Sequence, residues 1–212
     1  MFTGLVLECG VCVSATLTGA SGRRLRLRAT HERFRSVRLG DSIAVNGACL
    51  TVVGIEAHGS GFDLDFDVSE ETLARTNLAE ISGPGARVHL EASLRLGDEM
   101  GGHVVTGHVD ARGRIGQSRP QGDYVLWEVV LEGEARRRVA PYLVEKGSWA
   151  VDGVSLTVNE VLDEPDRTIV RMTLIPHTLV VTRFGGLAPG ALVNVEADLL
   201  AKYATRALRF KP

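Results

Sequence analysis

The sequence has 212 residues, of which 44% are hydrophobic and 24% are charged, the composition of an ordinary globular protein. Its net charge of −2, with both signs interspersed, argues against a surface that binds nucleic acid. The sequence shows no apolar run approaching the roughly 18 residues of a membrane span. The first ten residues lack the basic and apolar regions of a signal peptide. We therefore expect neither a membrane span nor a signal peptide.

The three cysteines do not form an even disulfide framework, which predicts a protein of the reducing cytoplasm. Cys9 and Cys12 form a C-x-x-C motif, but the sequence has no second pair of ligands at the spacing of a zinc site. We expect these thiols to be packed side chains and expect no metal.

The first half of the chain is dominated by β signals. Apolar and polar residues alternate over residues 24–28, 61–66 and 87–91, which is the period of a half-buried strand. Two more apolar segments flank Asn46-Gly47. This dipeptide favours a tight hairpin, because both residues tolerate positive φ.

The second half repeats the first. Residues 42–52, SIAVNGACLTV, and residues 148–158, SWAVDGVSLTV, are identical at seven of eleven positions with an offset of 106. Unrelated segments would give roughly one match. Matches continue on both sides at offsets of 103 to 106. We predict an all-β chain of two tandem six-stranded antiparallel Greek-key barrels, with copy one at 1–97, copy two at 98–198 and a C-terminal helix at 199–212.

Helix signals are short and occur in each copy and at the end of the chain. Ser69, followed by two glutamates, predicts an N-cap, and Pro176 fits the first turn of a matching helix. The three arginines at 136–138 are balanced by nearby glutamates and indicate a solvated helix face. In the tail, apolar residues at 200, 203, 204, 207 and 208 form one stripe. The pattern fits docking on the second barrel and oligomerisation equally well.

The two copies differ where chemistry would occur. Copy one has Asn46 and Cys49, and copy two has Asp152 and Ser155 at the matching positions. A lone cysteine in a strand is usually a small hydrophobe, but a matching serine suggests a polar site that faces a ligand. Asp198 either contributes to a site or caps the tail helix.

A glycine-rich stretch at residues 101–110 opens copy two and contains His103 and His108. It matches no phosphate-binding motif. Its glycines permit close approach of the backbone to a ligand or another strand. The histidines either make interface hydrogen bonds or lie near a ligand.

The chain resembles the riboflavin synthase family, which is built from two lumazine-binding repeats. The matching segments follow the family order over nearly the whole chain: MFTGLV, GDSIAVNGACLTV, DVSEETLARTNL, RLGDEMGGHVVTGHVD, KGSWAVDGVSLTV, IPHTL and VNVEADLLAKY. The resemblance implies that each barrel binds one 6,7-dimethyl-8-ribityllumazine. It also implies transfer of a four-carbon unit between the two molecules, giving riboflavin and 5-amino-6-(ribitylamino)uracil without a cofactor or metal.

The resemblance further implies a homotrimer joined through the C-terminal helix, an active site between subunits, and lumazine synthase as a candidate partner. It assigns catalysis to Phe2, Cys49, His103, His108, Asp152, Ser155, Thr157 and Asp198. In the first barrel it assigns substrate binding to Gly4, Leu5, Val6, Cys49, Leu50, Thr51, Asp67, Val68, Ser69, Glu70, Glu71 and Thr72. In the second it assigns substrate binding to Gly107, His108, Val109, Lys146, Ser155, Leu156, Thr157, Thr173, Leu174, Ile175, Pro176, His177 and Thr178.

Two other functions compete with this one. A non-catalytic lumazine-binding antenna protein shares the fold and the duplication, but the retained cysteine, histidine and aspartate candidates argue against it. A flavin-binding barrel of the ferredoxin-reductase type would need an R-x-Y-[ST] motif and a nicotinamide-binding domain, and the sequence has neither. Trp149, beside the Asp-Gly turn, fits the barrel core better than a pocket wall.

Overall fold

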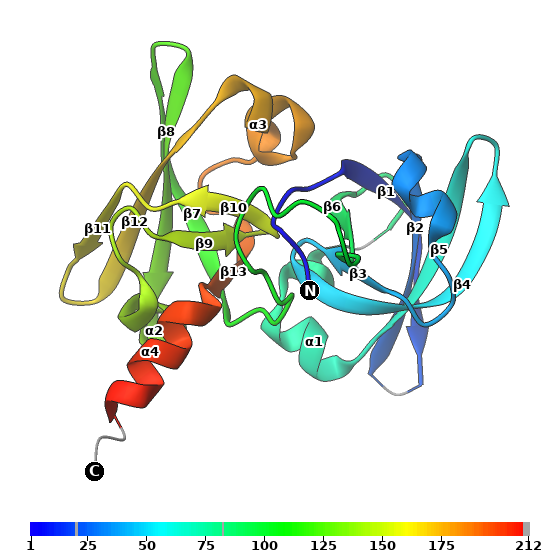
Figure 1. The fold of residues 1–212 in the computed structure, drawn as a ribbon, viewed down its shortest axis with the longest axis horizontal. Helices are drawn as coiled ribbons and strands as arrows, with labels where there is room; N and C mark the ends of the chain where they lie inside the picture. Colours follow the sequence, from blue (N-terminus) through cyan, green and yellow to red (C-terminus); the bar gives the residue numbers. More distant parts are fainter. Residues whose placement is uncertain (20, 82, 210–212) are drawn as a thin grey trace.

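The computed structural model describes residues 1–19, 21–81 and 83–209. Two β lobes lie side by side, with copy one coloured from blue to green and copy two from green to orange (Figure 1). The elements of copy one are β1 (Glu8–Thr18), β2 (Gly22–Ala29), η1 (Glu32–Ser36), β3 (Ser42–Val45), β4 (Ala48–His58), β5 (Gly61–Val68), α1 (Glu70–Arg75), η2 (Asn77–Glu80) and β6 (Arg87–Ala92).

Copy two repeats this order and ends in a helix. Its elements are β7 (Ala111–Gln121), β8 (Tyr124–Glu132), α2 (Gly133–Val139), η3 (Ala140–Tyr142), β9 (Ser148–Val151), β10 (Val154–Thr157), β11 (Glu160–Asp163), β12 (Arg167–Leu174), α3 (Pro176–Val181), η4 (Phe184–Gly186), β13 (Leu192–Ala197) and α4 (Leu199–Arg209). None of the helices within the described ranges has both the length and the apolar character needed to cross a membrane.

Copy one is a closed antiparallel barrel with strand order β1-β2-β5-β4-β3-β6, closed by β6 against β1. Copy two has the same order, but β10 and β11 together take the place of β4, giving a curled seven-stranded sheet. The break falls at Val158 and Asn159, and the Asn159 side chain accepts a hydrogen bond from the Thr173 amide (3.1 Å). The predicted all-β fold of two repeats and a C-terminal helix is confirmed, with one strand more than expected in copy two.

The sequence periodicity explains the sheets. Leu25 and Leu27 of β2 are fully buried in the first core. The three arginines that alternate with these leucines point outward and pair across the ladder with β5: Arg24 with Asp67, Arg26 with Asp65 and Arg28 with Asp63. The predicted helix starts are also confirmed, because Ser69 accepts from the Thr72 amide and Pro176 begins α3.

Trp149 belongs to the second core. Its side chain is fully buried, and its indole N–H donates to the sulfur of Met172 (3.2 Å). The expected core position is therefore confirmed, and Trp149 does not wall a pocket.

The two copies meet through an exchange of chain segments. Phe2 of copy one and Val105 of copy two form an antiparallel bridge, with N···O distances of 2.7 and 3.1 Å. The first residues of the chain thus run beside copy two, and the segment that opens copy two runs beside copy one (Figure 1). The predicted hairpin turns also meet here, because a Cβ on Gly47 would lie 2.5 Å from the amide nitrogen of Gly153. Both glycines have positive φ, so glycine satisfies the conformation and the contact together.

Helix α4 projects away from copy two (Figure 1). The side chains of its predicted apolar stripe face solvent, with Leu200, Tyr203 and Leu208 between 64% and 71% exposed. The apolar stripe of α4 therefore does not dock as a whole on copy two.

Candidate functional site: two half-sites exchanged between the repeats

In each copy a buried glutamate holds a Thr-Gly pair. The Glu91 carboxylate accepts from the Thr3 amide (2.7 Å), the Thr3 hydroxyl (2.8 Å) and the Gly4 amide (3.1 Å). Glu196 holds Thr106-Gly107 in the same way, at 2.7, 2.6 and 3.0 Å. Burial raises the pKa of both glutamates, and the hydrogen bonds they accept oppose that rise. These contacts fix the direction of the two glycine carbonyls.

Each glycine contacts the chemical residue of the opposite copy. The Gly107 carbonyl accepts from the Cys49 amide, and the Gly4 carbonyl accepts from the Ser155 amide, both at 2.8 Å. A Cβ on Gly107 would lie 2.6 Å from the Cβ of Cys49, and one on Gly4 would lie 2.5 Å from that of Ser155. Any side chain at either glycine would displace these strands.

This exchange corrects the expected grouping of the binding segments. The resemblance placed Gly4–Val6 with the first barrel and Gly107–Val109 with the second. In the structure Val6 packs on the second core and Val109 on the first. The reason is the bridge between Phe2 and Val105, which carries each segment to the other repeat.

The first half-site is a cavity of about 190 Å³ around Cys49. Helix α1 contributes Glu71 and Thr72, and the exchanged segment contributes Gly107, His108 and Val109. Cys49 is half-buried and His108 is exposed, so both can reach a molecule in this cavity. The ring of Phe2 is buried in a small cluster with Ala44, Val105 and Ala150, against which Cys49 packs.

The second half-site is built around His103 and Ser155. Nδ1 of His103 lies 2.7 Å from Oγ of Ser155, and the His103 amide donates to the Thr3 carbonyl (3.1 Å). Nε2 of His103 is buried and has no partner, the only such side-chain atom in the described chain. A buried polar atom without a partner in a native protein needs an explanation, and a missing ligand is one.

Burial lowers the pKa of His103, and the charge of nearby Asp198 opposes this shift. The imidazole is therefore neutral at neutral pH and can accept a proton. Asp198 also caps α4, because its Oδ1 accepts from the Leu200 amide (2.9 Å). The alternative role of Asp198 as a helix cap is confirmed, and its electrostatic effect on His103 adds to that role.

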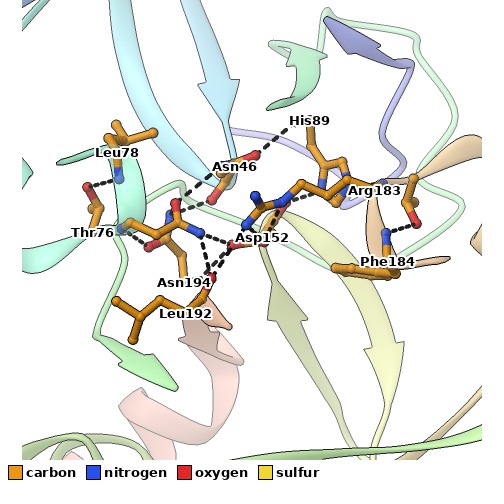
Figure 2. A network of polar contacts seen from close by, with 11 residues as sticks. Asn46, Thr76, Leu78, His89, Asp152, Arg183, Phe184, Leu192 and Asn194 are labelled. Atoms are coloured by element: carbon orange, nitrogen blue, oxygen red, sulfur yellow. Dashed lines mark hydrogen bonds and ion pairs between the residues drawn. The ribbon is translucent and has the colours of Figure 1, made fainter. Parts of the chain in front are cut away.

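Asp152 lies in a buried network between the repeats (Figure 2). Its side chain is fully buried, and Oδ1 accepts from the amide of Asn194 (2.7 Å) and Nδ2 of Asn77 (2.8 Å). Oδ2 accepts from Nε (3.1 Å) and Nη2 (2.6 Å) of Arg183. Four donors saturate this carboxylate, so its geometry suits a positioning role rather than contact with substrate.

The network ties the helix of each repeat to the opposite repeat. Asn77, after α1, donates its amide to Oδ1 of Asn194 in copy two (2.7 Å). Arg183, after α3, donates its amide to Nε2 of His89 in copy one (2.8 Å). The segments that follow α1 and α3 are therefore joined to the opposite repeat by one hydrogen-bonded frame, with unlike residues at matching positions of the two copies.

His89 makes the stability of this frame sensitive to acid. Burial lowers its pKa to about 4, although the charge of Asp152 and the Asp152 carbonyl, which lies 2.9 Å from Nδ1, oppose this shift. Between pH 6.5 and about 4, the unfolded chain binds a proton that the folded chain excludes. The free energy of unfolding should therefore fall as pH decreases through this window, by roughly 1.4 kcal/mol for each pKa unit of difference.

His89→Asn should flatten this dependence, because an asparagine side chain does not titrate. Copy two already has asparagine at the matching position, Asn194. The measurement is urea unfolding at pH 7, 6 and 5 for both proteins. The glutamates with raised pKa oppose the trend in both proteins equally, so the difference between the curves isolates His89. Parallel curves would show that His89 is not the acid-sensitive group.

The remaining predicted residues are spread over both copies, and Leu50 and Leu156 belong to the two cores. Residues 67–72 run from the end of β5 into α1, and residues 173–178 run from the end of β12 into α3. Thr157 and Lys146 are exposed on copy two, and Lys146 has a φ of 63° where copy one has a glycine, Gly40. The cavity at Cys49 is not lined by His103, Ser155 or Asp198, so the structure does not bring all the candidates into one cavity.

Sequence reasoning missed the residues that position the site. Glu91 and Glu196 were visible only as one more matched pair of the repeat, and a buried acid at both places was the available signal. Nothing in the local sequence indicated that Asn77, His89 and Arg183 meet Asp152.

Comparison with known proteins agrees with this architecture. A family model described as the lumazine binding domain matches residues 3–93 and 106–198. The chain therefore belongs to the lumazine-binding domain family. It is similar to riboflavin synthase of Mycobacterium bovis, with 44% identity over 99% of this chain and 98% of the relative. It is also similar to riboflavin synthases of Brucella abortus (38% identity, 100% of both chains) and Bacillus subtilis (35%, 98% and 90%). This full-length likeness places the chain with the enzymes of the family.

Among solved structures, the fold is similar to that of LumP complexed with 6,7-dimethyl-8-(1'-D-ribityl)lumazine. The TM-score is 0.76 at 23% identity, covering 93% of this chain and 99% of that one. LumP complexed with riboflavin gives the same TM-score. At this identity the likeness concerns the fold alone.

Proposed function

We propose that the chain catalyses the dismutation of two 6,7-dimethyl-8-ribityllumazine molecules. One molecule gives a four-carbon unit to the other, yielding riboflavin and 5-amino-6-(ribitylamino)uracil, with all atoms of the two substrates accounted for in the two products. The observation that carries the proposal is the pair of half-sites on one template with unlike groups: Cys49 and His108 in one, Ser155 and His103 in the other.

The reaction needs two identical rings held in unlike roles. Holding both reactants in a fixed geometry is itself a large part of catalysis. One ring must lose a proton from a methyl group, and the other must accept a nucleophile. In this proposal the neutral imidazole of His103, paired with Ser155, takes the proton, and Cys49 provides or orients the nucleophile. Asp152 and Asp198 position these groups, and no cofactor or metal takes part.

The size of the first cavity supports a site completed by another subunit. About 190 Å³ is smaller than the roughly 300 Å³ at which ligand pockets usually begin. We propose a cytoplasmic homotrimer in which α4 packs between subunits and a neighbouring chain covers each half-site. Lumazine synthase, which would supply the substrate, is a candidate partner.

The direct test is to mix the purified protein with the lumazine and follow the absorbance of riboflavin. Repeated turnover is the expected result. The alternative is a non-catalytic lumazine-binding antenna protein. The fold similarity to LumP complexed with the lumazine is the observation that favours this alternative. Stoichiometric binding of the lumazine without riboflavin formation would favour that alternative.

Removal of residues 199–212 should convert the oligomer to a monomer with folded barrels. The exposed stripe of Leu200, Tyr203 and Leu208 is the reason, since a stable soluble monomer seldom presents such a helix face unpaired. Light scattering measures the mass, and circular dichroism checks the fold. An unchanged mass would show that α4 does not hold the assembly.

A further inference from the structure

Helix α4 is joined to copy two by an ion pair between Lys202 and Asp110. The distance from Nζ to Oδ2 is 2.6 Å, and the two side chains are only 23% and 21% exposed. Asp110 follows directly after Gly107–Val109, the exchanged segment that lines the cavity at Cys49. The pair therefore connects the helix to one wall of the first half-site.

The same carboxylate also holds the start of the helix. Oδ2 of Asp110 accepts from the amide of Ala197 (2.9 Å), and the Asp110 amide donates to the carbonyl of Val195 (3.0 Å). Ala197 is followed in the chain by Asp198, whose charge acts on His103 in the second half-site. Asp198 is thus flanked in the chain by Ala197, whose amide is held by Asp110, and Lys202 donates its own amide to the Asp198 carbonyl (3.2 Å).

Copy one is built without this arrangement. Leu7 stands at the position that matches Asp110, and its amide makes the matching bond to the Leu90 carbonyl (3.0 Å). Its side chain packs on the first core and offers no carboxylate. Ser93 stands where copy two has Asp198. The barrel does not require the ion pair, so a reason for it must lie in what copy two and α4 do.

We infer that Lys202 and Asp110 are positioning residues for both half-sites. Their ion pair fixes the segment 107–109 against Cys49 and fixes Asp198 beside His103. This inference rests on the proposed function, and it assigns to α4 a role in the geometry of the site in addition to any role in assembly.

The test is the variant Lys202→Met, which keeps the aliphatic stem and leaves the apolar stripe of α4 unchanged. We expect kcat to fall about tenfold with KM within about twofold, because misplacement of catalytic groups slows the reacting step more than it weakens binding. Lys202→Arg restores the ion pair and should recover most of kcat. Mass by light scattering should equal that of the wild type in both variants.

Arg138→Met is the matched control. Arg138 and Lys202 line one cavity of about 590 Å³ beside α4. The variant loses the same charge, but Arg138 pairs with Glu134 on the surface of its own helix. We expect wild-type kcat for this control. Wild-type kcat in Lys202→Met, or a loss that arginine does not restore, would overturn the inference, as would a loss that appears only with a change in mass. If the wild type itself makes no riboflavin, the proposed function fails. The inference is then tested by the rate at which an alkylating reagent modifies the Cys49 thiol, which should change in Lys202→Met, since segment 107–109 lies against Cys49, and stay at the wild-type value in Arg138→Met.

Discussion

Cys49→Ser should lower kcat by about 100-fold or more, while the dissociation constant for the lumazine changes by less than about threefold. The side chain lies in the cavity at the first half-site, and its backbone is held by the Gly107 carbonyl. Serine keeps the shape and the backbone contact. Its hydroxyl holds its proton far more tightly than a thiol, so it is a much weaker nucleophile at neutral pH.

Steady-state kinetics and a fluorescence titration with the lumazine measure the two quantities. Cys9→Ser is the matched control, since Cys9 is also half-buried but contacts the Val181 carbonyl away from the cavity (3.6 Å). The control should retain wild-type kcat. A Cys49→Ser variant with near wild-type kcat would exclude a chemical role for this thiol.

Asp152→Asn should lower the free energy of unfolding by roughly 3–5 kcal/mol, the usual cost of breaking a buried ion pair. The substitution leaves the Arg183 guanidinium, only 20% exposed, without its partner. It also turns one acceptor of a saturated carboxylate into a donor. Asparagine tolerates the φ of 44° at this position, as Asn46 does at the same angle in copy one, so backbone strain does not contribute.

Urea unfolding measures this loss. Glu164→Gln removes the same charge from the exposed pair with Arg167 and should cost at most about 1 kcal/mol. The double variant Asp152→Asn with Arg183→Asn copies the Asn46 and Asn77 pair of copy one and should recover part of the stability. Equal losses in Asp152→Asn and Glu164→Gln would show that the buried network does not hold the repeats together.

Local signals predicted the elements well. The alternation in β2, the positive-φ turns at Asn46 and Asp152, and the cap at Ser69 depend on contacts within a few residues, and the structure has all of them. The internal repeat predicted two similar lobes. The break between β10 and β11 was missed because the sequence there still has the pattern of one strand.

The arrangement of the site could not be predicted in the same way. The bridge between Phe2 and Val105 joins residues about a hundred positions apart, and neither residue carries a local mark of its partner. For the same reason Asp152, which looked like a chemical group beside Ser155, lies in a buried frame with residues of both copies. The residue types of the site were visible in sequence, but their partners depend on tertiary contacts.

The most direct test of the proposed function is a mass balance on dialysed, metal-free protein incubated with excess lumazine. Chromatography should show two lumazine molecules consumed for each riboflavin formed, with one 5-amino-6-(ribitylamino)uracil released, over many turnovers per chain. Loss of lumazine limited to the number of protein sites, with no riboflavin, would contradict it.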